Sequence, residues 1–174
     1  LPPFIVTLAS LLFARGLLLA LTSEGSTTYT IDDPAFLALG RSSFLGLGTP
    51  VWIAVALLAL GGLVLHRTRF GQTVFAVGGA ENSALLMGLP VARAKLVVYT
   101  ASGLLAGLAG ALTAAYLQSG VTVIGVGTEL DAIAAVVIGG TLLTGGAGTV
   151  LGTAVGVLLR NVISNIINQV GGLD

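Results

Sequence analysis

Thirty-three consecutive residues of this chain, from Leu96 to Thr128, carry no charge, and a second uncharged run of 28 residues separates Asp131 from Arg160. Charged residues make up only 8% of the chain, whereas a soluble domain carries roughly 25%. So few charged groups cannot cover a surface that faces water, and the mean hydropathy of +1.05 agrees with this. The composition therefore excludes an ordinary soluble domain and predicts an integral membrane protein.

Helices long enough to cross a membrane need about 20 apolar residues. Three segments meet this requirement, over residues 4–22, 47–65 and 96–117. The run after Asp131 is too long for one span and is interrupted by Gly139-Gly140 and Gly145-Gly146. We predict a short or re-entrant helix over 130–138, a glycine-rich break, and a longer helix over 149–170. The predicted fold class is all-α, with residues 1–174 forming one polytopic transmembrane bundle.

The distribution of charge predicts how the spans are oriented. The segment 66–95 holds four of the seven basic residues, and the segment 23–50 is net acidic. Because basic loops remain on the cytoplasmic side, we expect 66–95 inside and 23–50 outside. The three predicted spans are consistent with this orientation.

Small residues recur every fourth position in two of the predicted helices: Gly103, Gly107, Ala111 and Ala115, and then Gly148, Gly152 and Gly156. In lipid, such spacing lets helix backbones approach closely. We interpret both series as packing seams without a transport role.

Several polar features lie inside the apolar segments, and each has a structural and a functional interpretation. Arg15 lies in the first span, where a cation must pair, snorkel or face a pathway. Glu129 and Asp131 begin the short helix, where carboxylates favour the helix dipole, or they line a path. Asparagines with helical spacing make interhelical hydrogen bonds or line a path for a hydroxyl-rich substrate. The candidate translocation residues are Arg15, Glu129, Asp131, Gly139, Gly140, Asn161, Asn165 and Asn168.

The basic segment contains a small amphipathic pattern. Gly78-Gly79 is expected to break the chain, Glu81 suits a first helical turn, and Pro90 ends the pattern. We therefore predict a short cytoplasmic helix over 80–89. An isolated helix of this length is marginal in water, so it requires a groove on another protein to pack into.

Motifs for catalysis or nucleotide binding are missing from the sequence. Gly140 to Gly146 has glycine spacing but no Walker A ending, and the glycines after Gly146 lack dinucleotide-binding spacing. The chain has no cysteine, and His66 is its single histidine, which we interpret as structural. With zero net charge, no nucleic-acid partner is indicated. We expect no enzyme activity, metal or cofactor in this chain.

Three stretches, "LPPFIVTLASLLFARG", "HRTRFGQTVFAVGGAENSALLMGL" and "GTELDAIAAVVIGGTLLTGGAGTVLGT", closely resemble the permease subunits of bacterial ABC sugar importers of the ribose, xylose and galactofuranose type. In that family the basic loop carries the coupling helix that docks on the ATPase subunit. The matching positions are Gly78, Gly79, Glu81, Ser83, Ala84, Leu86, Met87 and Gly88. Ala80 departs from the family, which usually has asparagine there, and Arg160 and Asn161 match no typical pattern.

The resemblance implies a multi-pass protein of the bacterial inner membrane that moves a monosaccharide. Its implied partners are an ABC ATPase that binds ATP and Mg²⁺, a periplasmic sugar-binding protein, a second permease subunit and the lipid bilayer. Family members are roughly twice as long, so we expect this chain to be a fragment. The alternatives are a secondary transporter or channel, an ABC permease for another small polar solute, or a structural membrane scaffold.

Overall fold

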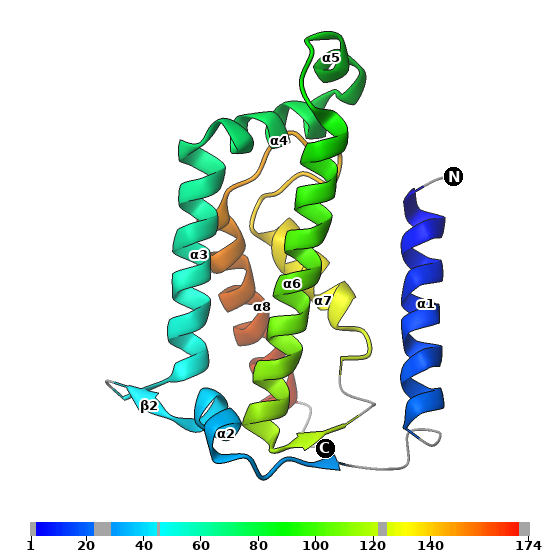
Figure 1. Ribbon diagram of the computed structural model, residues 1–174. Coiled ribbons are helices and arrows are strands. Elements are labelled where there is room, and N and C mark those ends of the chain that lie inside the picture. The colour runs from blue at the N-terminus through cyan, green and yellow to red at the C-terminus, as the bar shows by residue number, and fades with distance from the viewer. Residues whose placement is uncertain (1–2, 23–28, 45, 122–124, 171–174) are drawn as a thin grey trace. The chain divides into compact units, whose positions relative to one another are not determined.

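The computed structural model describes residues 3–22, 29–44, 46–121 and 125–170, which fold almost entirely as helices (Figure 1). The all-α fold class is confirmed. Three helices are long and apolar enough to cross a membrane, by length and composition: Thr49–Arg67, Val91–Leu117 and Val150–Gln169. The described residues divide into two compact units, one made of 1–50 with 108–126, and the other of 51–107 with 127–174.

The first unit begins with helix α1 (Pro3–Leu21), where the sequence predicts a span over 4–22. Strand β1 (Tyr29–Thr30) pairs antiparallel with β4 (Ser119–Gly120), which follows the end of α6. The sequence did not predict helix α2 (Pro34–Arg41). Its local signals are Asp33, whose carboxylate accepts a 2.9 Å hydrogen bond from the amide of Ala35, and the proline after it.

Gly40 of α2 brings that helix against the end of α6 (Val91–Leu117). A Cβ atom on Gly40 would collide with the backbone of Ala115 and Tyr116. The side chain of Ala115, the last residue of the predicted α6 seam, is fully buried. By contrast, a Cβ on Gly103 or Gly107 would meet nothing in this chain within 4 Å.

Two of the predicted span boundaries are corrected by the structure. Leu47 and Gly48 belong to strand β3 (Leu47–Gly48), which pairs with β2 (Ser43–Phe44), so helix α3 (Thr49–Arg67) begins two residues later than predicted. Helix α6 begins at Val91 rather than at Leu96, because the carbonyl of Pro90 accepts the amide of Ala94 at 3.0 Å. Arg93 and Lys95 are therefore helical.

In the second unit, the basic segment contains two helices, α4 (Arg69–Gly79) and α5 (Glu81–Leu86). The sequence analysis predicted only the second. The hydroxyl of Thr68 caps α4 by accepting the amide of Gly71 at 3.3 Å. The expected break at Gly78-Gly79 is confirmed, because α4 ends at Gly79 and the chain turns at Ala80, where φ is −154° and ψ is 91°.

Helices α7 (Thr128–Ile138) and α8 (Val150–Val170) form an antiparallel hairpin in which residue pairs meet once per turn. A Cβ on Gly139 would collide with the carbonyl of Gly152, and a Cβ on Gly156 would collide with the carbonyl of Ala135. One turn further along, the carboxylate of Asp131 pairs with the guanidinium of Arg160. The glycines of the predicted α8 seam thus pack directly on α7.

The predicted break between these helices is an irregular loop from Gly139 to Thr149. Gly140, Gly145 and Gly146 have φ of +83°, +88° and +79°, a conformation that other residues rarely adopt. The amide of Leu142 donates to the carbonyl of Ala147 at 3.1 Å. Because the loop pairs backbone groups internally, it lowers the cost of leaving the helical ladder.

Candidate functional site

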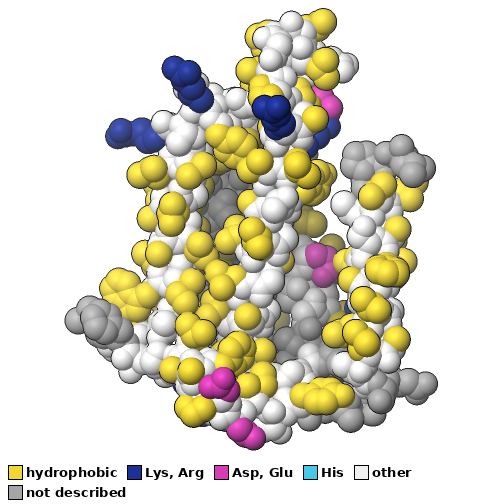
Figure 2. All heavy atoms as spheres, in the orientation of Figure 1, with side chains coloured by type: hydrophobic (Ala, Val, Ile, Leu, Met, Phe, Trp, Pro, Cys, Tyr) yellow, Lys and Arg dark blue, Asp and Glu magenta, His cyan; other side chains and the backbone are white. Residues whose placement is uncertain are grey.

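The exposed tip of α5 is the first candidate site. Leu85, Leu86 and Met87 expose 60%, 89% and 68% of their surface, although all three are large and apolar. Arg93 and Lys95 follow this tip in the first turns of α6, and Arg67 and Arg69 lie at the other end of α4; Figure 2 shows basic side chains at the end of the unit that holds α4 and α5. We call Leu85, Leu86 and Met87 the apolar tip. Exposed apolar side chains among basic ones are typical of a binding surface.

Local interactions fix the apolar tip in place. The amide of Leu89 donates to the carbonyl of Ala84 at 3.1 Å, and that of Gly88 donates to the carbonyl of Leu85 at 3.0 Å. With φ of +76° at Gly88, this is a Schellman ending. The sequence analysis predicted that Pro90 would end this helix. The helix instead ends at Leu86, so Met87 and Gly88 lie just beyond it.

Ion pairing joins α5 to the start of α6. Glu81, in the first turn of α5, lies 2.6 Å from the ammonium nitrogen of Lys95. Both side chains are about half exposed, so the pair contributes little to stability. The pair orients α5 relative to α6. Ala84, whose side chain is fully buried in the middle of α5, contributes to the same orientation. Ser83 is exposed, and its carbonyl accepts the amide of Met87.

The two glycines at the end of α4 contact the loop between α7 and α8. A Cβ on Gly78 would lie 2.9 Å from the amide nitrogen of Gly146, and a Cβ on Gly146 would lie 2.7 Å from the Cα of Gly79. A Cβ on Gly145 would collide with the carbonyl of Gly78. The backbones touch only because no side chain stands between them. Gly78 and Gly79 thus connect the helix before the apolar tip to the glycine-rich loop.

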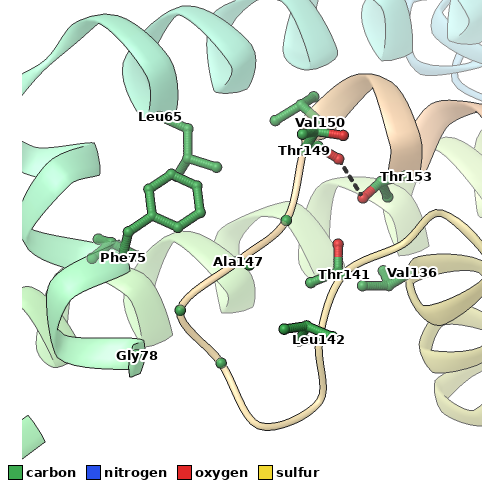
Figure 3. A pocket seen from close by; sticks show the side chains of 14 residues that line it. Leu65, Phe75, Gly78, Val136, Thr141, Leu142, Ala147, Thr149, Val150 and Thr153 are labelled. Atoms are coloured by element: carbon green, nitrogen blue, oxygen red, sulfur yellow. Dashed lines mark hydrogen bonds between the residues drawn. The ribbon is translucent and has the colours of Figure 1, made fainter. Parts of the chain in front are cut away.

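A cavity of about 320 Å³ lies beside this glycine contact. Figure 3 shows Leu65 of α3 and Phe75 of α4 on one side of it, with Thr141 and Leu142 of the loop opposite. Thr149 closes the loop at the start of α8, where its hydroxyl accepts the amide of Gly152 at 3.0 Å. The volume of this cavity leaves room for the loop to shift. Its lining is mostly apolar, so it offers few groups that could bind a polar solute.

The predicted translocation residues fall in different places. Arg15 lies exposed on α1, in the first unit. Glu129 and Asp131 lie in the first turn of α7, where the helix dipole favours carboxylates, and Gly127 at the N-cap supplies no side-chain hydrogen bond. Gly139 packs against Gly152, whereas a Cβ on Gly140 would meet nothing within 4 Å.

The three asparagines lie along one face of α8, as their spacing predicts. Asn161, Asn165 and Asn168 are all exposed. Within this chain the stripe is therefore not covered by other helices, and its expected orientation toward a bundle interior stays a prediction for the longer protein.

Two features of the site were missed by the sequence analysis. The pairing of Asp131 with Arg160 joins residues 29 positions apart, and only the antiparallel register of α7 and α8 reveals it. Helix α4 did have a signal, because Phe70, Val74 and Val77 have the spacing of one helical face and follow a threonine that suits an N-cap.

Comparison with known proteins identifies relatives along almost the whole chain. Residues 1–173 match the protein family described as "Branched-chain amino acid transport system / permease component". The chain is 41% identical over 169 residues to the ribose import permease protein RbsC of Bacillus subtilis, a match that covers 97% of this chain and 52% of the relative. No solved structure matches the chain.

Other relatives are named for different sugars. The chain is 39% identical to the fructose import permease protein FruG of Bifidobacterium longum, over 97% of this chain and 52% of that protein. It is 38% identical to the L-arabinose transport system permease protein AraH of Escherichia coli, over 94% of this chain and 49% of that protein. The chain spans about half the length of the curated relatives it matches.

Proposed function

This chain belongs to the family of branched-chain amino acid transport system permease components, and on that premise we propose that it forms part of the permease subunit of an ATP-driven monosaccharide importer in the bacterial inner membrane. As a family member it is a multi-pass membrane transport protein. The relatives named for ribose, fructose and L-arabinose support a monosaccharide as the solute.

The observation that carries the proposal is the apolar tip of α5. A six-residue helix with Leu86 almost fully exposed is not stable by itself in water, yet here it is anchored by the ending at Gly88 and the pair between Glu81 and Lys95. A groove on a separate ATPase subunit would bury the tip. ATP and Mg²⁺ would be bound by that partner.

The coupling step follows from how α5 is attached. When the ATPase pair closes on ATP, α5 moves with the groove that holds it. Gly78 and Gly79 at the end of α4 pass this displacement to Gly145 and Gly146, and thus to the loop between α7 and α8. The hairpin of α7 and α8 then shifts relative to the rest of the bundle, and the path opens to the other side. Two permease subunits and a periplasmic sugar-binding protein complete the importer.

The competing function from another class is a secondary transporter or channel. It would need titratable or coordinating groups at membrane depth as ion sites. Within the residues that the structure describes, no three His, Cys, Asp or Glu side chains lie close enough to hold a metal ion, and the carboxylate of Asp131 is already paired with Arg160. The apolar tip also has no role in such a transporter, so we favour the ATP-driven importer.

Reconstitution tests this function directly. The full-length protein, its ATPase and its binding protein are placed in liposomes, and uptake of ribose, fructose and L-arabinose is measured with and without ATP. We expect ATP-dependent uptake of at least one sugar, and uptake that follows an ion gradient without ATP would refute the proposal.

A substitution at Leu86 tests the docking surface. Leu86→Glu should abolish ATP-dependent uptake and release the ATPase from the purified complex, because a carboxylate cannot be buried in an apolar groove without several kcal/mol of cost. Leu86→Met, which keeps the apolar surface, should retain both. A charged residue at Gly88 is a weaker test, because the φ of +76° there would strain any side chain.

A further inference from the structure

The ion pair between Asp131 and Arg160 has no role in the coupling described above. It joins the first turn of α7 to the middle of α8, and it is the only ion pair that the described part of the chain forms between these two helices. No carboxylate or basic residue other than these two lies between Leu130 and Asn161 in the sequence. An isolated charge pair in so apolar a region requires an explanation.

The depth of the pair follows from the helix geometry. Arg160 lies ten residues after the first residue of α8, which is about 15 Å along the axis. The hydrocarbon core of a bilayer is about 30 Å thick. A Cβ on Gly62 would lie 3.9 Å from Val150, so the start of α8 lies beside α3, about 7 Å inside the basic end of that helix. The pair therefore lies within the membrane-spanning length of α8, beyond its midpoint as measured from the basic end.

The pair is also open to its surroundings. The side chain of Arg160 is 33% exposed and that of Asp131 is 48% exposed. Contact of such groups with lipid at this depth costs several kcal/mol, so charged side chains in membrane spans face a water-filled cavity or other protein. The neighbouring turn of α8 adds Ser164, which is half-buried, and Asn161, which is exposed. Hydroxyl, amide and charged groups thus occupy one sector of the helix.

We propose that the Asp131–Arg160 pair lines the water-filled path and is a specificity-determining contact for the hydroxyl groups of the transported sugar. The inference rests on the proposed function and names the residues that contact the solute. Asp131 offers carboxylate oxygens that accept hydrogen bonds from sugar hydroxyls, and Arg160 offers N–H groups that donate to them. Because the two charges cancel, the pair favours a neutral polyhydroxylated solute over an anion or a cation.

The same pair would also stabilise the hairpin, and the experiment must separate the two roles. A purely structural pair works equally well with its charges exchanged. A contact for a solute does not, because exchanging the charges moves the donors and acceptors to opposite helices. The variant Asp131→Arg with Arg160→Asp therefore tells the roles apart, in the full-length protein with its ATPase and binding protein.

We expect the single variant Arg160→Met to reduce the amount of folded protein, and the exchanged variant to recover that amount. The KM for uptake of whichever of ribose, fructose or L-arabinose the unmodified protein transports should rise at least tenfold in the exchanged variant. An exchanged variant with recovered folding and an unchanged KM would overturn the proposal. Failure of the unmodified protein to take up any of these sugars would instead count against the proposed function.

Chemical accessibility gives a second measurement that does not depend on folding of charge variants. Ser164→Cys replaces a residue one turn from Arg160, and Val162→Cys replaces an exposed residue at the same depth on the opposite face. Any cysteine elsewhere in the full-length protein is first replaced. A small water-soluble methanethiosulfonate should modify position 164 at least tenfold faster than position 162, and the transported sugar should slow the reaction at 164. Equal rates at both positions, or no protection by the sugar, would overturn the proposal.

Discussion

Gly78 and Gly146 meet backbone to backbone, with the amide nitrogen of Gly146 lying 2.9 Å from the position that a Cβ on Gly78 would occupy. This contact joins two motifs that are 68 residues apart in the sequence. One precedes the apolar tip and the other lies in the break between α7 and α8. The glycine pair at the end of α4 is thereby explained by packing as well as by helix termination.

Substitution at the glycine contact should disconnect ATP hydrolysis from transport. In Gly145→Ala, the new methyl group would collide with the carbonyl of Gly78, and φ of +88° would strain the residue by about 1–2 kcal/mol. We expect ATP-dependent uptake to fall at least tenfold while the ATPase still copurifies. Ala147→Gly, in the same loop, serves as a control for added flexibility. Normal uptake by Gly145→Ala would contradict the coupling route.

The break itself depends on the conformation of Gly140. Gly140→Val should impair uptake without preventing membrane insertion, because a β-branched residue is disfavoured at φ of +83° although the site has room for a side chain. Gly140→Asn should be much less harmful, since asparagine tolerates positive φ. Uptake and membrane content are measured for both variants. Equal activity in the two would show that backbone conformation at this position does not matter.

The hairpin of α7 and α8 depends on Gly156. Gly156→Ala should lower the yield and melting temperature of the purified protein, because its methyl group would collide with the carbonyl of Ala135. In an ordinary helix position the same change adds about 0.5–1 kcal/mol of stability. Gly62→Ala is the matched control, since its Cβ would lie 3.9 Å from Val150, at normal contact distance. A melting temperature for Gly156→Ala at or above that of the control would disprove the close approach.

The orientation in the membrane is tested with Asn82→Cys on α5. This chain has no cysteine of its own, so a reagent reports on the introduced residue once cysteines outside the chain are replaced. We expect an impermeant maleimide to label position 82 in inverted membrane vesicles but not in intact cells, because the positive-inside rule predicts that the basic segment faces the cytoplasm. Labelling of intact cells would reverse the predicted topology.

Sequence patterns predicted the long helices well because apolar length is a property of each segment alone. The same is true of the break at Gly139 to Thr149, which repeated glycines indicate. The errors came from interactions between segments or from short-range capping. Gly78-Gly79 was recognised as the end of a helix, but its packing against Gly145 and Gly146 was not, because these partners are remote in the sequence. The helix ending at Leu86 depended on the conformation of Gly88, which competed with the more obvious signal at Pro90.

For the candidate site, residue types were predicted more readily than partners. Asp131 was recognised as a polar group in an apolar region, but its partner Arg160 was not, because helix register decides the pair. The structure places Asp131 in the first turn of α7, as the dipole interpretation expects, and pairs it with Arg160 of α8 as well. Glu81 was placed correctly in a first turn, whereas its contact with Lys95 needed the reversal of the chain at Gly88.

The contacts that lead from α4 to α8 share one property: Gly78 with Gly146, Gly139 with Gly152, and Ala135 with Gly156 all meet through main-chain atoms. Side chains absorb small displacements by changing rotamer, and a joint made of main chain has no rotamers to change. A movement of about an ångström at one end would therefore arrive at the other almost undiminished. Glycine is the most flexible residue in the chain when taken alone. At these contacts, however, the glycines form its most rigid connection between helices.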